Sequence, residues 1–394
     1  MLGVSVWGLA LGQALLITGN ILLVSVTALI GQQLAPNLSL ATLPVATQFL
    51  GLMGVILPAA LLMRTVGRKK GFFIGNLIGI IGAFTAFYAL QQTNFVLFCC
   101  ATLLLGMAIG VGQQYRFAAI ENAPNDKTPQ AISLIMGAGV IAAILGPNMA
   151  IWAEFIVPDT QYLGAFAALL VLYIATTILI LMLPLRQPTQ EEQTGTPRSY
   201  KTLLKQPNLL AAITSGVIGY TVMTLVMTAT PLAMHGHGFH FGHTATVIQW
   251  HVLGMFAPSF FTGKFIQKYG TTKVIQAGCL LLLICVVLNQ FGSGYWYFWT
   301  ALIFLGIGWN FTFIGATALL TKTYQPADKA KVQGLNDFLV FTGATIGSVL
   351  AGYWQNLFGW EILNLLMIPF ILAAMLSVWL SARKSLPVIT TETT

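Results

Sequence analysis

Four ionisable side chains lie inside long apolar segments of this 394-residue chain, where a charge is costly and usually functional. They are Arg116, His251, Lys264 and Asp337. Gln113 and Arg116 share one face of a helix, and a guanidinium beside an amide can hold a carboxylate, an imide or a carbonyl group. The alternative for Arg116 is snorkelling to the nearby interface. His251 either titrates near neutral pH and joins a proton path or stays neutral at a helix contact.

A second group of candidate ligands is a histidine-rich tract. His235, His237, His240 and His243 fall within nine residues, and such tracts can bind Zn²⁺ or Cu²⁺. The interspersed glycines give no rigid ligand geometry, so a solvated loop is the favoured interpretation and metal or pH sensing is the alternative. The other acids, histidines and cysteines are scattered along the sequence. We therefore predict no cofactor, no metal site and no enzyme activity.

The amino-acid composition indicates that these residues belong to a membrane protein. The chain is 57% hydrophobic and 7% charged, with a mean hydropathy of +0.81, whereas soluble domains carry about 25% charged residues. A span needs about 20 apolar residues, and its backbone must satisfy its hydrogen bonds internally, so the spans are helices. We predict an all-α membrane protein with twelve transmembrane helices, numbered 1 to 12, at residues 3–31, 39–63, 71–91, 95–119, 130–153, 161–184, 207–234, 244–267, 273–291, 295–321, 332–355 and 361–382.

Basic residues predict the orientation of these spans. All eighteen Lys and Arg residues fall in, or within a few residues of, the even-numbered connections or the C-terminal tail. Cytoplasmic loops carry the Lys and Arg excess of membrane proteins, so both termini are predicted to be cytoplasmic. The net charge of +8 then reflects topology and anionic lipid, and no nucleic-acid partner is expected.

The longest polar stretch divides the chain into two halves. Residues 185–206 are rich in Pro, Gln and Thr, which is typical of a linker. We predict two pseudo-symmetric six-helix bundles, at residues 1–184 and 207–382, and a cytoplasmic tail at residues 383–394. The halves repeat weakly, since Gly67 after span 2 matches Gly270 after span 8 and GVGQQYRF resembles GIGWNFTF. Such a repeat indicates a transporter whose site lies between its halves, near the midplane.

With this layout the chain resembles the major facilitator superfamily over its whole length. The family pattern after span 2 is roughly G-x-L-x-D-R-x-G-R-R/K. This chain has at those positions Ala60, Leu62, Arg64, Thr65, Gly67, Arg68 and Lys69. Arg64 therefore stands where the family has an acid, and Ala60 where it has a glycine.

Two further features carry the resemblance. In span 5, Gly137 and the pair Gly146 and Pro147 resemble a motif of proton-driven exporters, although Met149 and Ala150 replace its following glycines. The strings QWHVLGMFAPSFFTGKFI and VQGLNDFLVF are similar to a bacterial subgroup of the family. The bacterial inner membrane is therefore the expected location.

The resemblance implies that spans 1, 4, 7 and 10 line the substrate cavity. Spans 1, 7 and 10 have no charged side chain, so we expect a neutral or weakly charged organic substrate. Amides can read the edges of a planar ligand and aromatic rings can stack on it, although Trp and Tyr also form interfacial belts. The candidate substrate-binding residues are Gln13, Asn20, Gln113, Tyr115, Arg116, Tyr220, Thr224, Trp309 and Asn310.

The resemblance also implies that the cytoplasmic ends of spans 2 and 11 meet. Arg64 lies at that end of span 2 and Asp337 lies about one turn inside span 11, so a contact between them would hold the cytoplasmic side closed. The competing hypothesis pairs Arg116 with Asp337 as a proton-linked switch, because an acid that loses its cation gains proton affinity. A static ion pair is the third interpretation. Together with His251, these are the candidate gating and proton-coupling residues.

The predicted function is secondary active transport of a small organic solute by alternating access. The sequence has no nucleotide-binding motif, so a proton gradient is the favoured driving force. The alternatives are a multidrug- or siderophore-type exporter, an importer of a vitamin such as riboflavin, and a membrane receptor that binds without transport. The expected partners are the substrate, the proton and the lipid bilayer, and the chain is predicted to be a monomer.

Overall fold

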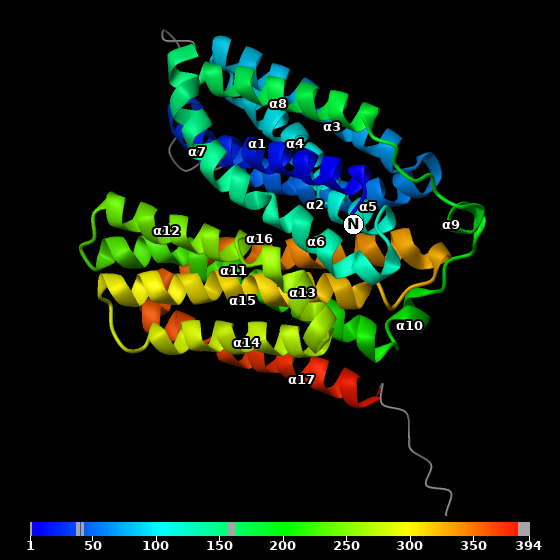
Figure 1. The fold of residues 1–394 in the computed structure, drawn as a ribbon. Helices are drawn as coiled ribbons and strands as arrows, with labels where there is room; N and C mark the ends of the chain where they lie inside the picture. Colours follow the sequence, from blue (N-terminus) through cyan, green and yellow to red (C-terminus); the bar gives the residue numbers. More distant parts are fainter. Residues whose placement is uncertain (1, 37–39, 41–42, 157–161, 385–394) are drawn as a thin grey trace, which may run out of the picture. The chain divides into compact units, whose positions relative to one another are not determined.

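The computed structural model describes residues 2–36, 40, 43–156 and 162–384, which form helices and short connections without a strand (Figure 1). The all-α prediction is thereby confirmed. The chain divides into two compact units. Unit 1 comprises Met1–Thr196 and Pro326–Phe338, and unit 2 comprises Pro197–Gln325 and Leu339–Thr394. Most of the tail predicted at residues 383–394 lies outside the described residues.

Unit 1 is built from the first half of the chain and one later segment. Its elements are α1 (Val4–Leu34), α2 (Leu43–Val66), α3 (Arg68–Gln91), α4 (Phe95–Gly112), α5 (Tyr115–Glu121), η2 (Asn125–Lys127), α6 (Thr128–Gly137), α7 (Gly139–Ile156), α8 (Leu163–Met182), α9 (Gln190–Thr194), η3 (Pro326–Asp328) and the first turns of α16 (Lys329–Leu365). In this unit α4 packs against α2 and α3, and α8 packs against α3 and α1.

Unit 2 holds the remaining helices. They are α10 (Tyr200–Leu203), α11 (Pro207–Gly236), α12 (Phe241–Phe256), α13 (Ser259–Tyr269), α14 (Thr271–Leu288), α15 (Tyr295–Leu320), the rest of α16 and α17 (Ile368–Lys384). In this unit α15 packs against α11, α12 and α14. The helix α16 thus begins in unit 1 and continues into unit 2.

The twelve-helix prediction fits these elements. In the described residues, ten stretches are long and apolar enough to cross a membrane. Predicted span 8 is not among them because it is divided into α12 and α13 at Ala257 and Pro258. Spans 11 and 12 form one stretch, Pro326–Arg383, but Gly359 interrupts its helical backbone with a φ of 77°. That interruption lies between the predicted ends of the two spans.

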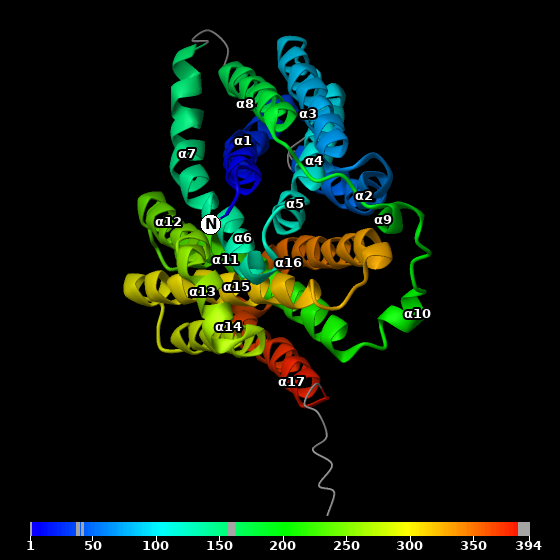
Figure 2. The ribbon, with the colours of Figure 1, turned by 45° about the vertical axis from the view of Figure 1, so that its right-hand side comes forward.

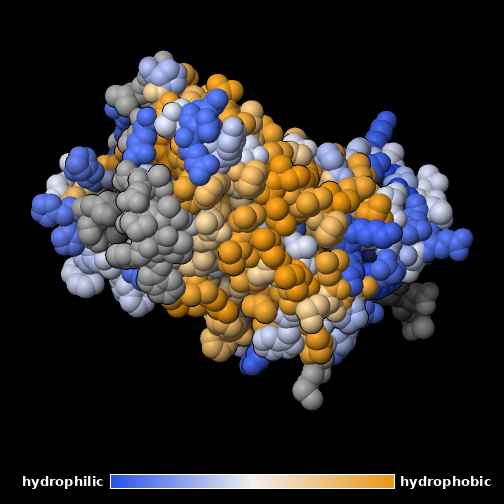
Figure 3. Space-filling model, turned by 90° about the horizontal axis from the view of Figure 1, so that it is seen from above, coloured by the Kyte–Doolittle hydropathy of each residue, from blue (hydrophilic) through white to orange (hydrophobic). Residues whose placement is uncertain are grey.

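Apolar side chains cover much of the outer surface of unit 1. Figure 3 shows a broad hydrophobic band between hydrophilic ends. Phe84 on α3 and Val171 and Ile178 on α8 are more than half exposed. A contiguous apolar surface of this kind is rare on a soluble monomer and common on a protein that is solvated by lipid.

Two glycines give the repeat a structural counterpart. Gly67 joins α2 to α3 with a φ of 83°, and Gly270 joins α13 to α14 with a φ of 85°. Residues with a Cβ rarely adopt this region of the backbone map. The residues that match in sequence therefore make the same turn in the two units.

In unit 1, α2 and α4 approach each other backbone to backbone. A Cβ added to Gly106 would overlap the main-chain carbonyl of Gln48, and one added to Gly51 would overlap the carbonyl of Leu103. Small residues commonly permit such close packing between helices in a membrane.

We expect Gly106→Ala to lower the free energy of unfolding by about 1–3 kcal/mol, because backbone atoms on both sides must move apart. Gly54→Ala on α2 is the matched control, since its Cβ would meet nothing within 4 Å. Thermal unfolding in detergent measures both variants. Equal melting temperatures for the two would contradict the backbone-to-backbone packing.

Candidate functional site

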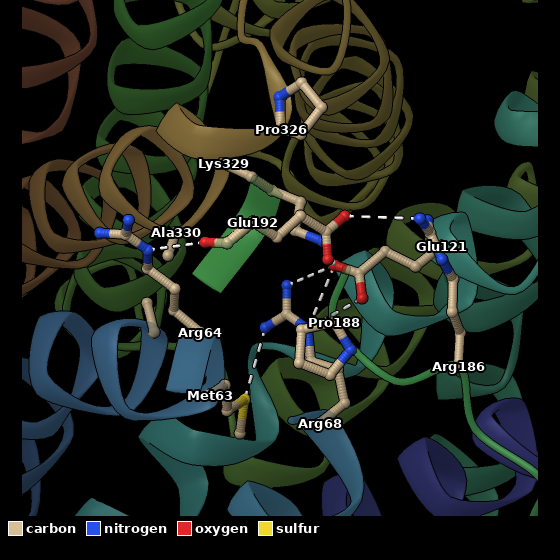
Figure 4. A pocket seen from close by; sticks show the side chains of 11 residues that line it. Met63, Arg64, Arg68, Glu121, Arg186, Pro188, Glu192, Pro326, Lys329 and Ala330 are labelled. Carbon is tan, nitrogen blue, oxygen red and sulfur yellow. Dashed lines mark hydrogen bonds and ion pairs between the residues drawn. The ribbon is translucent and has the colours of Figure 1, made fainter. Parts of the chain in front are cut away.

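Charged side chains gather at one end of unit 1. We name Arg68, Glu121, Arg186, Glu192 and Lys329 the basic-end cluster (Figure 4). They come from the start of α3, the end of α5, the segment after α8, the short helix α9 and the start of α16. The cleft they line with neighbouring residues has a volume of about 20 Å³. That space holds one water molecule and no organic substrate.

Charges of opposite sign alternate through the basic-end cluster. The Glu192 carboxylate lies 3.6 Å from Arg186 and 2.8 Å from the Lys329 ammonium. Lys329 lies 3.3 Å from Glu121, which in turn pairs with Arg68 at 2.6 Å. Only Arg186 is well exposed, at 47% of its side chain. Most of this network is therefore shielded from solvent and weakly screened by salt.

Arg68 binds the largest number of partners in the cluster. Its side chain is 6% exposed, and Nε and Nη2 both donate to the Glu121 carboxylate. Nη1 donates to Oε1 of Gln114 at 2.9 Å, and Nη2 donates to Oε1 of Gln333 at 2.7 Å. The turn at Gly67 places this side chain at the first position of α3. The planar guanidinium holds five N–H donors in a fixed fork, so it can serve acceptors that lie further apart than those within reach of one ammonium.

A second ion pair lies deeper in unit 1. Arg116 on α5 donates to Oδ1 of Asp337 on α16, and the two side chains are 3% and 0% exposed. Asn336 donates to Oδ1 of Asp337 at 3.0 Å, and Gln114 donates to Oδ2 at 3.3 Å. Because Gln114 also accepts from Arg68, it links the deep pair to the basic-end cluster.

This geometry corrects two sequence-based expectations. Arg64 does not contact Asp337, although both are described; it donates instead to the main-chain oxygens of Glu192 and Gly195. The competing partner, Arg116, is the one that binds Asp337. The helix is also interrupted at residues 113–114. There the main-chain N–H of Gln114 donates to the carbonyl of Val111, three residues back, instead of four. The continuous-helix spacing that placed Gln113 on the face of Arg116 therefore does not apply there, and Gln114 is the residue whose side-chain amide bonds to Asp337.

The predicted substrate residues of unit 1 are polar groups that are buried or half-buried on α1 and around the junction of α4 and α5. Gln13 is buried on α1, and Asn20, two turns later, accepts a hydrogen bond from Nε2 of Gln48 at 3.2 Å. Gln113 is half-buried, and Tyr115 packs on Phe72 with ring centroids 4.1 Å apart. Gln48 is not among the predicted substrate residues, because the resemblance implies a cavity lined by spans 1, 4, 7 and 10, and Gln48 lies on span 2. A lone amide in the apolar first part of α2 was the available signal.

Aromatic rings surround the predicted residues of unit 2. Trp309 is buried and stacks on Phe313 at 5.1 Å, while Tyr220 stands edge-on to Trp309 at 5.4 Å. Thr224 lies half-buried on α11, one turn after Tyr220.

Asn310 on α15 bridges the break in span 8. It donates to the Met255 carbonyl at 2.7 Å and to the Ser259 hydroxyl, and it accepts from the Thr262 hydroxyl at 2.6 Å. These bonds connect α15 to the end of α12 and the start of α13.

The histidines fall into two settings. His251 is fully buried on α12, and its Nδ1 lies 2.8 Å from the Leu302 carbonyl, so Nδ1 carries a proton that it donates to that oxygen. In the tract at residues 235–243, the rings of His240 and His243 are stacked with centroids 6.3 Å apart. Within the described ranges, no group of three or more His, Cys, Asp or Glu residues is placed to hold a metal ion.

Comparison with known proteins places this arrangement among transporters. The model of the Major Facilitator Superfamily matches residues 9–257 and 238–393. The riboflavin transporter RfnT of Brucella anthropi is 40% identical over 367 residues, which cover 92% of each chain. YdeG of Bacillus subtilis, an uncharacterised transporter of the same type, is 27% identical over 88% of this chain and 86% of its own. The Escherichia coli transporter FucP, solved in an outward conformation, has a TM-score of 0.79 at 15% identity, over 97% of this chain and 98% of its own, which shows the fold alone.

Proposed function

Because the chain belongs to the Major Facilitator Superfamily, we propose that it is a secondary transporter for riboflavin or a closely similar neutral flavin, coupled to protons. The observation that carries the proposal is the 40% identity to a riboflavin transporter over 92% of both chains. A match of this length reaches both predicted halves of the chain. A fold alone would not support a substrate, since one fold serves many substrates.

The side chains of the candidate site suit such a ligand. Riboflavin combines a planar ring system with an imide edge and a hydroxylated chain, and it carries no net charge. The amides of Gln13, Asn20 and Gln48 can exchange hydrogen bonds with imide and hydroxyl groups. The half-buried ring of Tyr220 offers aromatic surface for a planar ring, and the buried Trp309 supports it edge-on. The helices α1, α11 and α15 contain no Lys, Arg, Asp or Glu, which favours a neutral substrate over a phosphorylated one.

Proton coupling rests on the deep ion pair. Asp337 is fully buried and faces the cation of Arg116, the amides of Gln114 and Asn336, and more remotely the cation of Arg68. If the transport cycle separates Asp337 from Arg116, the carboxylate loses its counter-charge inside a poorly solvated site and gains proton affinity. We therefore assign Asp337 as the proton-binding residue.

Flux into liposomes tests the proposal. The purified protein is reconstituted, a pH gradient is imposed, and uptake of riboflavin is followed by its fluorescence, with riboflavin 5′-phosphate as the charged comparison. We expect accumulation that a protonophore abolishes, and riboflavin 5′-phosphate moving at least about 100-fold more slowly, because a charge without a partner is costly at midplane depth.

Each other outcome changes the proposal in a defined way. Riboflavin flux equal to that of empty liposomes would refute the proposal that riboflavin is the substrate. Binding without flux would make the protein a receptor. Flux that does not respond to the pH gradient would remove proton coupling and leave a facilitator.

A further inference from the structure

The linker between the two predicted halves is structured where it meets unit 1. Its helix α9 (Gln190–Thr194) begins with a capping box, in which Thr189 and Glu192 bond each other's backbone amides. Five residues are too few to hold a helix in isolation. Tertiary contacts must therefore hold α9 in place, and Figure 2 shows it beside the end of α2 and the segment that begins α16.

Arg64 supplies the main contact from α2. Its Nε donates to the carbonyl of Glu192 at 2.7 Å, and its Nη2 donates to the carbonyl of Gly195. A cation at the C-terminal end of a helix is favourable, because the last carbonyls lack partners within the helix. The residue that departs from the family pattern therefore bonds to the C-terminal end of α9.

The position of α9 places the Glu192 side chain at the start of α16. Its side chain is 7% exposed and lies 2.8 Å from the ammonium of Lys329, the first residue of α16. Lys329 also pairs with Glu121, which already accepts three hydrogen bonds from Arg68. Without Glu192, the cleft would hold four cations and one carboxylate, since its lining includes Arg64, Arg68, Arg186 and Lys329.

We propose that Glu192 replaces the carboxylate that the family pattern has at position 64, and that α9 acts as a latch that keeps the first turns of α16 on unit 1. Release of this latch is a step of the transport cycle, so Glu192 and Arg64 are positioning residues that never touch substrate. The inference rests on the proposed transport function, because only a transporter needs to release segment 326–338.

The test measures how often the first turns of α16 leave unit 1. Ala330 lines the cleft and is 7% exposed. In a background without the native cysteines, Ala330→Cys reports opening through its rate of reaction with a water-soluble maleimide. This readout requires no substrate. A latch result and a failure to transport riboflavin are therefore distinguishable.

Glu192→Gln is the central variant, because glutamine preserves the capping box and removes only the charge. We expect it to raise the labelling rate at least about tenfold, which corresponds to the loss of one charged hydrogen bond, and to change the maximal rate of transport more than its KM. Glu191→Gln, on the exposed side of the same helix, should leave both unchanged.

Arg64→Gln is a second, independent variant, since it releases α9 and leaves the charge of Glu192 intact. It should also raise the labelling rate, and Lys329→Gln combined with Glu192→Gln should have little more effect than either change alone. An unchanged labelling rate in folded Glu192→Gln or folded Arg64→Gln would overturn the latch. Fully additive effects of the Glu192 and Lys329 changes would also overturn it.

Discussion

Asp337→Leu is expected to abolish proton-driven transport and to lower the free energy of unfolding by about 3–5 kcal/mol. The change leaves the Arg116 guanidinium, whose side chain is 3% exposed, without its carboxylate. Gln114 and Asn336 lose the acceptor that they share. The penalty comes mainly from the uncompensated buried charge, and less from the value of the pair itself.

A double variant separates stability from transport. Arg116→Met combined with Asp337→Leu removes both charges, and apolar replacements of a buried ion pair are often neutral or stabilising. We expect this protein to recover most of the lost stability and none of the transport. Chemical unfolding in detergent and flux in liposomes measure the two properties, and Asp126→Leu serves as the exposed control. Proton-driven transport by the folded double variant would refute the role of Asp337.

Arg68→Lys is expected to lower the free energy of unfolding by about 2–3 kcal/mol, although it conserves the charge. Arg68 reaches Glu121, Gln114 and Gln333 through three nitrogens in one plane. The single ammonium of lysine can approach Glu121 but cannot reach the two amides at the same time. Those amides are buried and would lose a partner.

The same substitution at Arg186 is the matched control. Arg186 belongs to the same cluster, but it is 47% exposed and its ion pair with Glu192 spans 3.6 Å. An exposed pair of this length contributes about 0–1 kcal/mol to stability. Arg186→Lys should therefore leave the free energy of unfolding almost unchanged. Melting temperatures of the two variants measure the difference. If Arg68→Lys is as stable as Arg186→Lys, the multiple bonds of the guanidinium are irrelevant to stability.

The sequence was sufficient for the fold because each span is encoded locally. An apolar run of about 20 residues has few alternatives to a helix in a bilayer, and the matching turns at Gly67 and Gly270 need nothing beyond the glycines and their neighbours. Asp337 was recognisable for a similar reason, since a carboxylate in an apolar run needs a partner. The prediction was correct that such a partner exists.

The choice between Arg64 and Arg116 depended on information that is not local. Arg64 is occupied by α9, which lies 128 residues further along the chain and reads in the sequence as part of a flexible linker. Gln114 reaches Asp337 because the helix is interrupted just before α5, a break that the hydropathy of the segment does not reveal. The basic-end cluster was interpreted as a topology signal, because Glu192 and Lys329 come together only after folding.

Unit 1 is discontinuous in sequence, and this affects how the protein is made. Arg116 is synthesised 221 residues before Asp337. At about 5–20 residues per second, an interval of roughly 10–40 s passes before the counter-ion leaves the ribosome. During that interval the guanidinium must remain at the membrane surface or bind a temporary partner such as a lipid headgroup. Unit 1 therefore stays incomplete while most of unit 2 is synthesised, and a chain truncated before residue 326 would expose a half-built charge network to quality control in the cell.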